Sequence, residues 1–169
     1  MMQSYCLDTS GISNPLENMP EDIHATLWAQ VTAAIELGKF CWNKEIMDEL
    51  ESIHGAVGDC IRSCGASMCY EIGDDGWPWQ EYLDHFERMR VEYESVISEY
   101  NGNRKSTVGL NDISIIAFAK TLKLPLVSME KPNTHQASVK RMRIPDVCGK
   151  EGVKHLTFNE FLRAEGMTA

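Results

Sequence analysis

Two acidic residues follow predicted strands, where a side chain can reach into the crevice of a parallel sheet. Asp8 ends the short apolar run Tyr5-Cys6-Leu7, and Thr9-Ser10-Gly11 comes directly after it. Glu130 follows the apolar run Leu124–Ser128 by two residues. Ordinary turn chemistry explains an Asp-Thr-Ser-Gly sequence, since these residues suit a chain reversal. The alternative is a carboxylate at the carboxyl end of a parallel strand, where α/β proteins bind their ligands.

Two further acids lie on predicted helices. With about 100° between successive residues, Ile46 and Leu50 define the buried face of a helix over 43–53, and Glu49 falls at the edge of that face. A surface glutamate explains Glu49 equally well. Asp112 opens the apolar run Ile113–Ala119, where capping and the helix dipole also account for an acid.

The combination of Asp8, Glu49, Asp112 and Glu130 favours a metal site. In a doubly wound sheet, the carboxyl ends of the strands share one crevice, so four carboxylates there repel unless a divalent cation neutralises them. Oxygen ligands select Mg²⁺ or Mn²⁺ over softer metals.

The hydrophobic pattern predicts an α/β fold in one domain, residues 1–169, with a central parallel sheet flanked by helices on both faces. The predicted strands are 3–7, 39–42, 124–128 and 153–156, and the predicted helices are about 20–37, 43–53, 79–100, 111–122 and 157–166. A less clear helical stretch follows residue 53, and a short turn is expected at Ile144–Gly149. The apolar stripe along the helix predicted over 79–100 suits either the core of the domain or an interface between subunits.

Composition restricts the classes of protein. Hydrophobic residues make up 43% and charged residues 24%, which are globular values. No apolar run is long enough to span a bilayer, and no signal peptide is recognisable, so we expect a cytoplasmic protein. Residues 1–103 hold 5 Lys and Arg against 19 Asp and Glu, whereas residues 104–169 hold 11 against 6. The acidic total excludes a general nucleic-acid coat, but a local basic face is compatible with it.

Three cysteines, Cys60, Cys64 and Cys69, have a spacing that suggests three zinc ligands. Structural zinc sites need four ligands, commonly in Cys-x-x-Cys pairs. No such pair and no nearby histidine completes a set, so the sequence favours free thiols.

The four acidic motifs together resemble a PIN domain, a compact α/β nuclease fold, over essentially the whole chain. The PIN pattern has a first strand ending Leu-Asp-Thr, as in Leu7-Asp8-Thr9, and a helical acid before Leu, as in Glu49-Leu50. Its third acid opens an Ala-rich helix, as Asp112 does, and its fourth follows a later strand, as Glu130 does. PIN domains usually carry Asn where Ser10 stands, and Asp is commoner than Glu at the fourth position.

The C-terminal part is more specific. Glu130-Lys131-Pro132, Arg143–Cys148 and Phe161-Leu162-Arg163 resemble a PIN-like family of uncharacterised proteins allied to VapC-type toxins.

This resemblance implies a metal-dependent ribonuclease, the toxin of a toxin–antitoxin pair, with Asp8, Glu49, Asp112 and Glu130 as catalytic and metal-binding residues. RNA would be the substrate and an antitoxin protein the partner, and VapC-like relatives often form homodimers. Ser10, through a metal-bound water, and Lys140, Arg141 and Arg143, through phosphates, are the expected substrate contacts. A plain solvated basic stretch explains those three cations equally well.

Two other functions compete with the nuclease. A catalytically degenerate PIN-like domain would act only as a binding module, although four intact acids argue against it. A phosphotransferase of the haloacid dehalogenase type also begins with a strand and an Asp, but it needs a second Asp where Ser10 stands.

Overall fold

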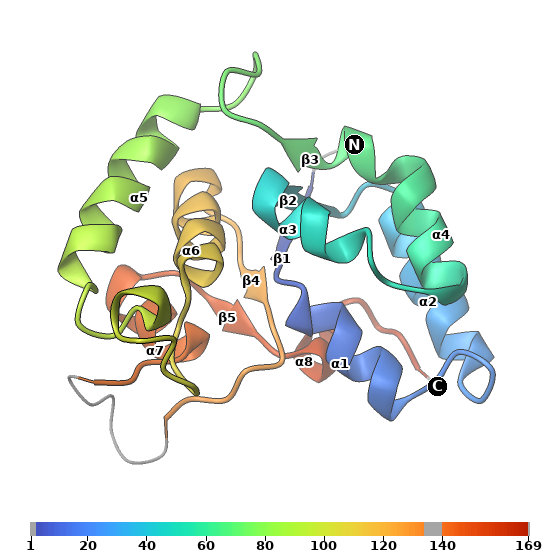
Figure 1. The fold of residues 1–169 in the computed structure, drawn as a ribbon. Coiled ribbons are helices and arrows are strands. Elements are labelled where there is room, and N and C mark those ends of the chain that lie inside the picture. Colours follow the sequence, from blue (N-terminus) through green and yellow to red (C-terminus); the bar gives the residue numbers. More distant parts are fainter. Residues whose placement is uncertain (1–2, 134–139, 169) are drawn as a thin grey trace.

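The computed structural model describes residues 3–133 and 140–168. Within them, five parallel strands form one sheet in the order β3-β2-β1-β4-β5 (Figure 1). The strands are β1 (Tyr5–Leu7), β2 (Phe40–Asn43), β3 (Cys69–Tyr70), β4 (Leu126–Val127) and β5 (His155–Leu156). The α-helices are α1 (Ser10–Asn18), α2 (Ala25–Glu36), α3 (Lys44–Leu50), α4 (Gly55–Cys64), α5 (Trp79–Glu92), α6 (Leu110–Leu122), α7 (Ile144–Glu151) and α8 (Phe158–Ala164). Short 3₁₀ turns η1 (Gly65–Ser67) and η2 (Ser98–Tyr100) complete the elements.

Helices cover both faces of the sheet. In Figure 1, α5, α6 and α7 lie to one side, and α1, α2, α4 and α8 lie to the other. The helix α6 packs against β1 and β2, and α5 packs on the outside of α6. The predicted α/β architecture with a parallel central sheet is therefore confirmed.

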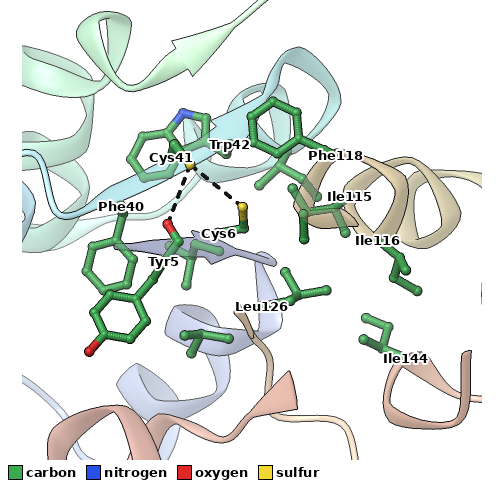
Figure 2. Close-up of a cluster of buried hydrophobic side chains, with 14 of the residues drawn as sticks. Tyr5, Cys6, Phe40, Cys41, Trp42, Ile115, Ile116, Phe118, Leu126 and Ile144 are labelled. Carbon is green, nitrogen blue, oxygen red and sulfur yellow. Dashed lines mark hydrogen bonds between the residues drawn. The ribbon is translucent and has the colours of Figure 1, made fainter. Parts of the chain in front are cut away.

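The alternation of side chains along β1 and β2 builds the two halves of the core. Cys6 and Cys41 pair in register and bring their sulfurs to 3.7 Å, on the side of Phe118 from α6 (Figure 2). Tyr5 and Phe40 point the other way (Figure 2) and contact Phe161 of α8, with ring centroids 5.1 and 5.0 Å away. Both faces of these strands are buried, as a parallel sheet requires.

Several predicted elements are confirmed with small shifts of their ends. Asn43 caps α3 by accepting a hydrogen bond from the Ile46 N–H at 3.2 Å, and Thr157 caps α8 by accepting one from the Glu160 N–H at 3.2 Å. The helix predicted over 111–122 is α6, and it is buried almost all round, from Ile113 to Ala119.

The N-terminal region differs from the prediction in two places. The chain continues from Asp8 into α1, a helix that the sequence analysis does not predict. Pro15 lies inside this helix and lacks a backbone donor, which in a sequence argues against a helix. The helix expected from Pro20 begins only at Ala25. Ile23 is 72% exposed, and Glu21 instead accepts a hydrogen bond from the Val57 N–H at the start of α4 at 2.8 Å.

The long helix predicted over 79–100 ends at Glu92. The chain after Glu92 turns away from the helix axis because it bonds a segment that returns toward it. Thr107 Oγ1 donates to the Val96 carbonyl at 2.6 Å, and the Ser98 N–H donates to the Val108 carbonyl at 2.8 Å. Four members of the predicted apolar stripe, Met89, Tyr93, Val96 and Ile97, are buried in the core. Trp79, Leu83 and Phe86 are half-buried against that core, and Tyr100 is 44% exposed. The stripe therefore gives no support to a homodimer.

Two elements near the ends of the sheet were missed or misjudged. The expected turn at Ile144–Gly149 is the helix α7, which has Pro145 in its first turn and ends at Gly152, whose φ is 71°. The strand β3 lies in the stretch that was read only as weakly helical. In the part of the chain that the structure describes, no helix is long and apolar enough to cross a membrane.

Candidate active site

Parallel strands bring the acidic residues to one edge of the sheet. Asp8 directly follows β1, and Glu130 follows the adjacent strand β4, with Cys6 paired to Leu126. Glu49 lies on α3, which begins where β2 ends, and α6 packs against α3, β1 and β2. The charges of Glu49 and Glu130 act on both Asp8 and Asp112. The structure thus brings the four predicted carboxylates to one edge of the sheet, within range of one another's charge.

Asp8 is the most buried of these acids, with 5% of its surface exposed. Its Oδ2 accepts two hydrogen bonds from Ser10, from the hydroxyl at 2.6 Å and from the backbone N–H at 3.1 Å. Burial raises the pKa of Asp8 to about 6, and the charges of Glu130 and Glu49 add to that rise, whereas the bonds from Ser10 oppose it. Asp8 is therefore a carboxylate that is poorly hydrated and surrounded by other negative charges.

Asp112 has two functions at once. Its Oδ2 accepts a hydrogen bond from the Gly109 N–H at 2.8 Å, so it does cap the start of α6. The pKa of Asp112 is nevertheless raised well above its ordinary value, first by burial and then by the charge of Asp8. Capping alone would lower the pKa of a carboxyl group, so burial and, after it, the charge of Asp8 outweigh the cap.

Glu49 is held at both carboxylate oxygens. Thr9 Oγ1 donates to Oε2 at 2.5 Å, and Asn111 Nδ2 donates to Oε1 at 2.9 Å. Glu49 is half-buried, whereas Glu45 and Asp48 of the same helix are exposed. The predicted orientation of this helix is therefore confirmed, and Glu49 is fixed between the residues that follow Asp8 and precede Asp112.

Glu130 is positioned from two sides. Its Oε2 accepts a hydrogen bond from the Ile144 N–H at the start of α7 at 2.8 Å. Its own N–H donates to Ser128 Oγ at 3.3 Å, and that hydroxyl also bonds His155 Nε2 at 2.6 Å. A neutral imidazole can accept from the Ser128 hydroxyl or donate to it, according to its tautomer. Burial lowers the pKa of His155 and supports that neutral form.

Gly11 allows α1 to begin this close to β4. A side-chain carbon at Gly11 would lie 2.7 Å from the Val127 carbonyl oxygen and 3.0 Å from Leu7 Cδ1. The same approach places Ser10 Oγ where it accepts a hydrogen bond from the Met129 N–H at 3.2 Å. Ser10 thereby joins Asp8 to the segment that carries Glu130.

The chemistry of this donor set fits a hard divalent cation. The four acids supply only oxygen ligands, and a cation would offset both the burial and the neighbouring negative charges that raise the pKa of Asp8 and Asp112. In the described ranges, 3–133 and 140–168, no three His, Cys, Asp or Glu side chains converge closely enough to hold a metal ion. Each of the four carboxylates instead accepts hydrogen bonds from the protein, from Ser10, from Gly109, from Thr9 and Asn111, and from Ile144.

The three predicted basic residues differ in how they are connected to the acids. Arg143 precedes Ile144, which binds Glu130, and its N–H donates to Asp146 Oδ2 at 2.9 Å. Lys140 and Arg141 are exposed and pack with the loop before α6. The rest of the basic segment 131–143 that was noted in the sequence, residues 134–139, lies outside the described residues.

Two residues that bond directly to an acid were missed in the sequence. Thr9 and Asn111 each donate to Glu49, and each stands next to one of the predicted acids, Asp8 or Asp112. That adjacency was the available signal. The sequence did not show that a strand end and a helix start 102 positions apart contact the same carboxylate.

Comparisons with known proteins place the chain in a family without a named activity. Residues 5–169 match the family described as "Domain of unknown function (DUF4411)". The match covers nearly the whole chain, which therefore belongs to that family. No curated protein matches the chain.

Two solved structures are similar to the chain. One is titled "Crystal structure of DNA bound VapBC from Salmonella typhimurium", with 15% identity and a TM-score of 0.46. The other is "2.2 A resolution structure of VapBC-1 from nontypeable Haemophilus influenzae", with 14% identity and a TM-score of 0.46. Each match covers 93% of this chain and 99% of the other.

The chain has the architecture that its motifs predicted. It has a parallel sheet with helices on both faces, a first strand that ends in Asp8, and three further acids at the same edge.

Proposed function

We propose that this member of the DUF4411 family is a ribonuclease that depends on Mg²⁺ or Mn²⁺ and is the toxin of a toxin–antitoxin pair. The observation that carries the proposal is the burial of Asp8 and Asp112 at one edge of the sheet, where the charges of Glu49 and Glu130 act on both. Burial raises the pKa of both groups, and the charge of Asp8 raises that of Asp112 further. Enzymes accept such unfavourable pairs of like charges where the charges do chemistry.

Asp8 and Asp112 are the residues that would hold the cation, with Glu49 and Glu130 as further ligands or as bases for the attacking water. A bound Mg²⁺ or Mn²⁺ supplies Lewis acidity toward a scissile phosphate. Thr9 and Asn111 orient Glu49, and Ser10 holds Asp8. We also assign a substrate contact to Ser10, which is half-buried and bonds both Asp8 and the Met129 N–H.

An acidic site needs nearby cations to attract a polyanion. Lys140, Arg141 and Arg143 belong to the basic C-terminal part of the chain, and Arg143 adjoins the residue that binds Glu130. We assign these three residues to the phosphates of an RNA substrate. Clustered Lys and Arg provide the sequence-independent part of such binding.

The toxin assignment rests on the resemblance of the C-terminal motifs to proteins allied to VapC. On this basis the partner is a cognate antitoxin protein. A homodimer stays a prediction, and the burial of the apolar stripe in the core gives it no support.

Two experiments test the proposal. The purified chain should cleave single-stranded RNA in Mg²⁺ or Mn²⁺ and lose that activity in EDTA. Expressed alone in bacteria, the wild type should arrest growth, whereas Asp8→Asn/Asp112→Asn should not. Removal of two like charges relieves repulsion, so the double variant should fold, and its loss of toxicity would be chemical.

A binding module would give a different result. Growth arrest that survives the double substitution in folded protein would exclude cleavage at this site as its cause. Identical growth with both proteins, together with retained partner binding, would support the catalytically degenerate alternative.

A further inference from the structure

Two basic loop segments that are far apart in the sequence pair with each other beside the site. Arg104 Nη1 donates to the Lys140 carbonyl at 2.6 Å, and Arg141 Nε donates to the Lys105 carbonyl at 3.3 Å. These reciprocal bonds join two consecutive cations of one segment to two of the other. We call Arg104, Lys105, Lys140 and Arg141 the basic ridge.

The pairing continues from the basic ridge into the backbone. The Val108 N–H donates to the Met142 carbonyl at 2.8 Å, and the Met142 N–H donates to Thr107 Oγ1 at 3.0 Å. Val108 and Met142 are buried. The basic ridge is thus anchored to the core and has a defined place on the surface.

Both segments lead directly to a carboxylate of the candidate site. After Val108, the chain reaches Gly109, whose N–H binds Asp112. After Met142, it reaches Ile144, whose N–H binds Glu130. Figure 1 shows the segment before α6 close to the start of α7, at one end of the molecule. The backbone therefore connects the basic ridge to the residues that bind Asp112 and Glu130.

The backbone around Arg104 and Lys105 is held in an unfavourable form. Asn103 and Ser106, on either side of them, have φ of 57° and 62°, in the left-handed region that residues other than glycine rarely adopt. Such conformations cost roughly 1–3 kcal/mol each and persist mainly where function requires them. Here they hold two adjacent cations in a fixed turn, with Lys105 exposed.

We propose that the basic ridge binds the phosphate backbone of single-stranded RNA and leads the strand to the carboxylates. This inference rests on the proposed ribonuclease function, and it adds Arg104 and Lys105 to the substrate surface. Charge favours this occupant, because the acidic site repels a polyanion and needs a positive surface directly next to it. The side chains of Arg104 and Arg141 build the basic ridge, and those of Lys105 and Lys140 add charge to it.

The test compares two double variants that lose the same charge. Lys105→Gln/Lys140→Gln leaves both arginine hydrogen bonds in place. The control, Lys123→Gln/Lys154→Gln, changes two exposed lysines near the opposite end of α6 from Asp112. Binding of a short labelled single-stranded RNA is measured by fluorescence anisotropy in EDTA, at several salt concentrations, so that cleavage plays no part.

The variant of the basic ridge should bind RNA more weakly and with less salt dependence. Each lost contact to a single strand reduces the slope of log K against log salt by about 0.7. Two lost contacts therefore reduce the slope by about 1.4, and affinity at 0.1 M salt falls roughly 25-fold by the same relation. The control should match the wild type.

The failure of this inference differs from the failure of the proposed function. Wild type that cleaves RNA, with equal affinity and slope for both double variants, would overturn the role of the basic ridge and leave the nuclease. RNA binding that depends on the basic ridge, without any cleavage, would support this inference and contradict the proposed ribonuclease function. Binding of polyglutamate but not of RNA would overturn it in favour of an acidic protein partner.

Discussion

Thr9 Oγ1 donates a hydrogen bond to Glu49 Oε2 at 2.5 Å and joins the end of the first strand to the third helix. The two residues are 40 positions apart in the sequence. With Asn111 on its other oxygen, Glu49 is fixed from both sides of the site. This arrangement makes Glu49 the acid whose orientation depends most clearly on neighbouring side chains.

The first prediction separates Glu49 from an acid on the outer side of the same helix. Glu49→Gln should lower RNA cleavage by at least about a hundredfold, the usual contribution of a placed acid or base. Asp48→Asn should leave cleavage unchanged, because Asp48 is exposed and pairs with Lys44 at 2.9 Å. The measurement is the initial rate of cleavage in Mn²⁺. Equal losses in the two variants would show that Glu49 has no special role.

The second prediction concerns the bond from Thr9. Thr9→Val keeps the shape of the side chain but removes the donor, so Glu49 should lose its fixed orientation. Loss of such a supporting hydrogen bond commonly costs about 10- to 100-fold in metal affinity or activity. Thr9→Ser, which keeps the hydroxyl, should retain most of the activity. A Thr9→Val enzyme as active as the wild type would contradict the positioning role.

The third prediction concerns the metal. A ligand that binds only the folded state at 100 times its Kd stabilises that state by about 2.7 kcal/mol. For a domain of this size, each kcal/mol raises the Tm by about 2–4 °C, so saturating Mn²⁺ should raise the wild-type Tm by roughly 5–10 °C. Asp8→Asn should abolish the gain, and Asp48→Asn should keep it. The absence of a Tm rise in the wild type at millimolar Mn²⁺ would remove the basis of the catalytic proposal.

The fourth prediction follows from the raised pKa of Asp8. A folded-state pKa of about 6 lies above the ordinary value of 3.8, so the folded protein binds this proton more tightly than the unfolded chain. In EDTA, the contribution of Asp8 therefore destabilises the protein above pH 6 and is relieved as the pH falls toward 4. The shift corresponds to about 3 kcal/mol. Roughly half of it, about 1.4 kcal/mol, falls between pH 5 and pH 8. Urea unfolding at these two pH values should show the wild type less stable at pH 8 by that amount through Asp8, and Asp8→Asn should lack this part of the pH dependence. An unchanged pH dependence would contradict the assignment.

The fifth prediction concerns Glu151, which holds α5, α6 and α7 together. Its carboxylate accepts hydrogen bonds from Arg88 at 2.5 Å, Tyr93 at 2.6 Å and Lys120 at 3.0 Å. Burial raises its pKa, but these three donors outweigh burial and lower the pKa to about 2. The stabilisation is complete above pH 4.5 and is lost as the pH falls from there to about 2.

Glu151→Gln should therefore lower the free energy of unfolding at pH 7 by about 3 kcal/mol, since it removes a buried charge that Arg88, Tyr93 and Lys120 all bind. Glu92→Gln removes the other, exposed partner of Arg88 and should cost at most about 0.5 kcal/mol. Urea unfolding of both variants checks the difference. Equal stabilities would mean that Glu151 stabilises no more than a surface pair.

The sequence by itself determined the main elements around the site. The run Ile113–Ala119 is apolar nearly all round, which only a buried helix explains, and α6 occupies that place. The spacing of Ile46 and Leu50 oriented α3 and placed Glu49 at the edge of its buried face. Period and capping are local properties, so they can be read from neighbouring residues.

Only the tertiary structure decided which groups meet. The bond between Thr9 and Glu49 depends on where α3 packs, and the pairing of Arg104 with Lys140 depends on the return of the chain before α6. The early end of α5 has the same origin, because Thr107 contacts Val96 only after that return. Such contacts arise from packing between segments that are distant in sequence, and no local propensity encodes them. The raised pKa of Asp8 and Asp112 is likewise a property of burial and of charges that folding brings together.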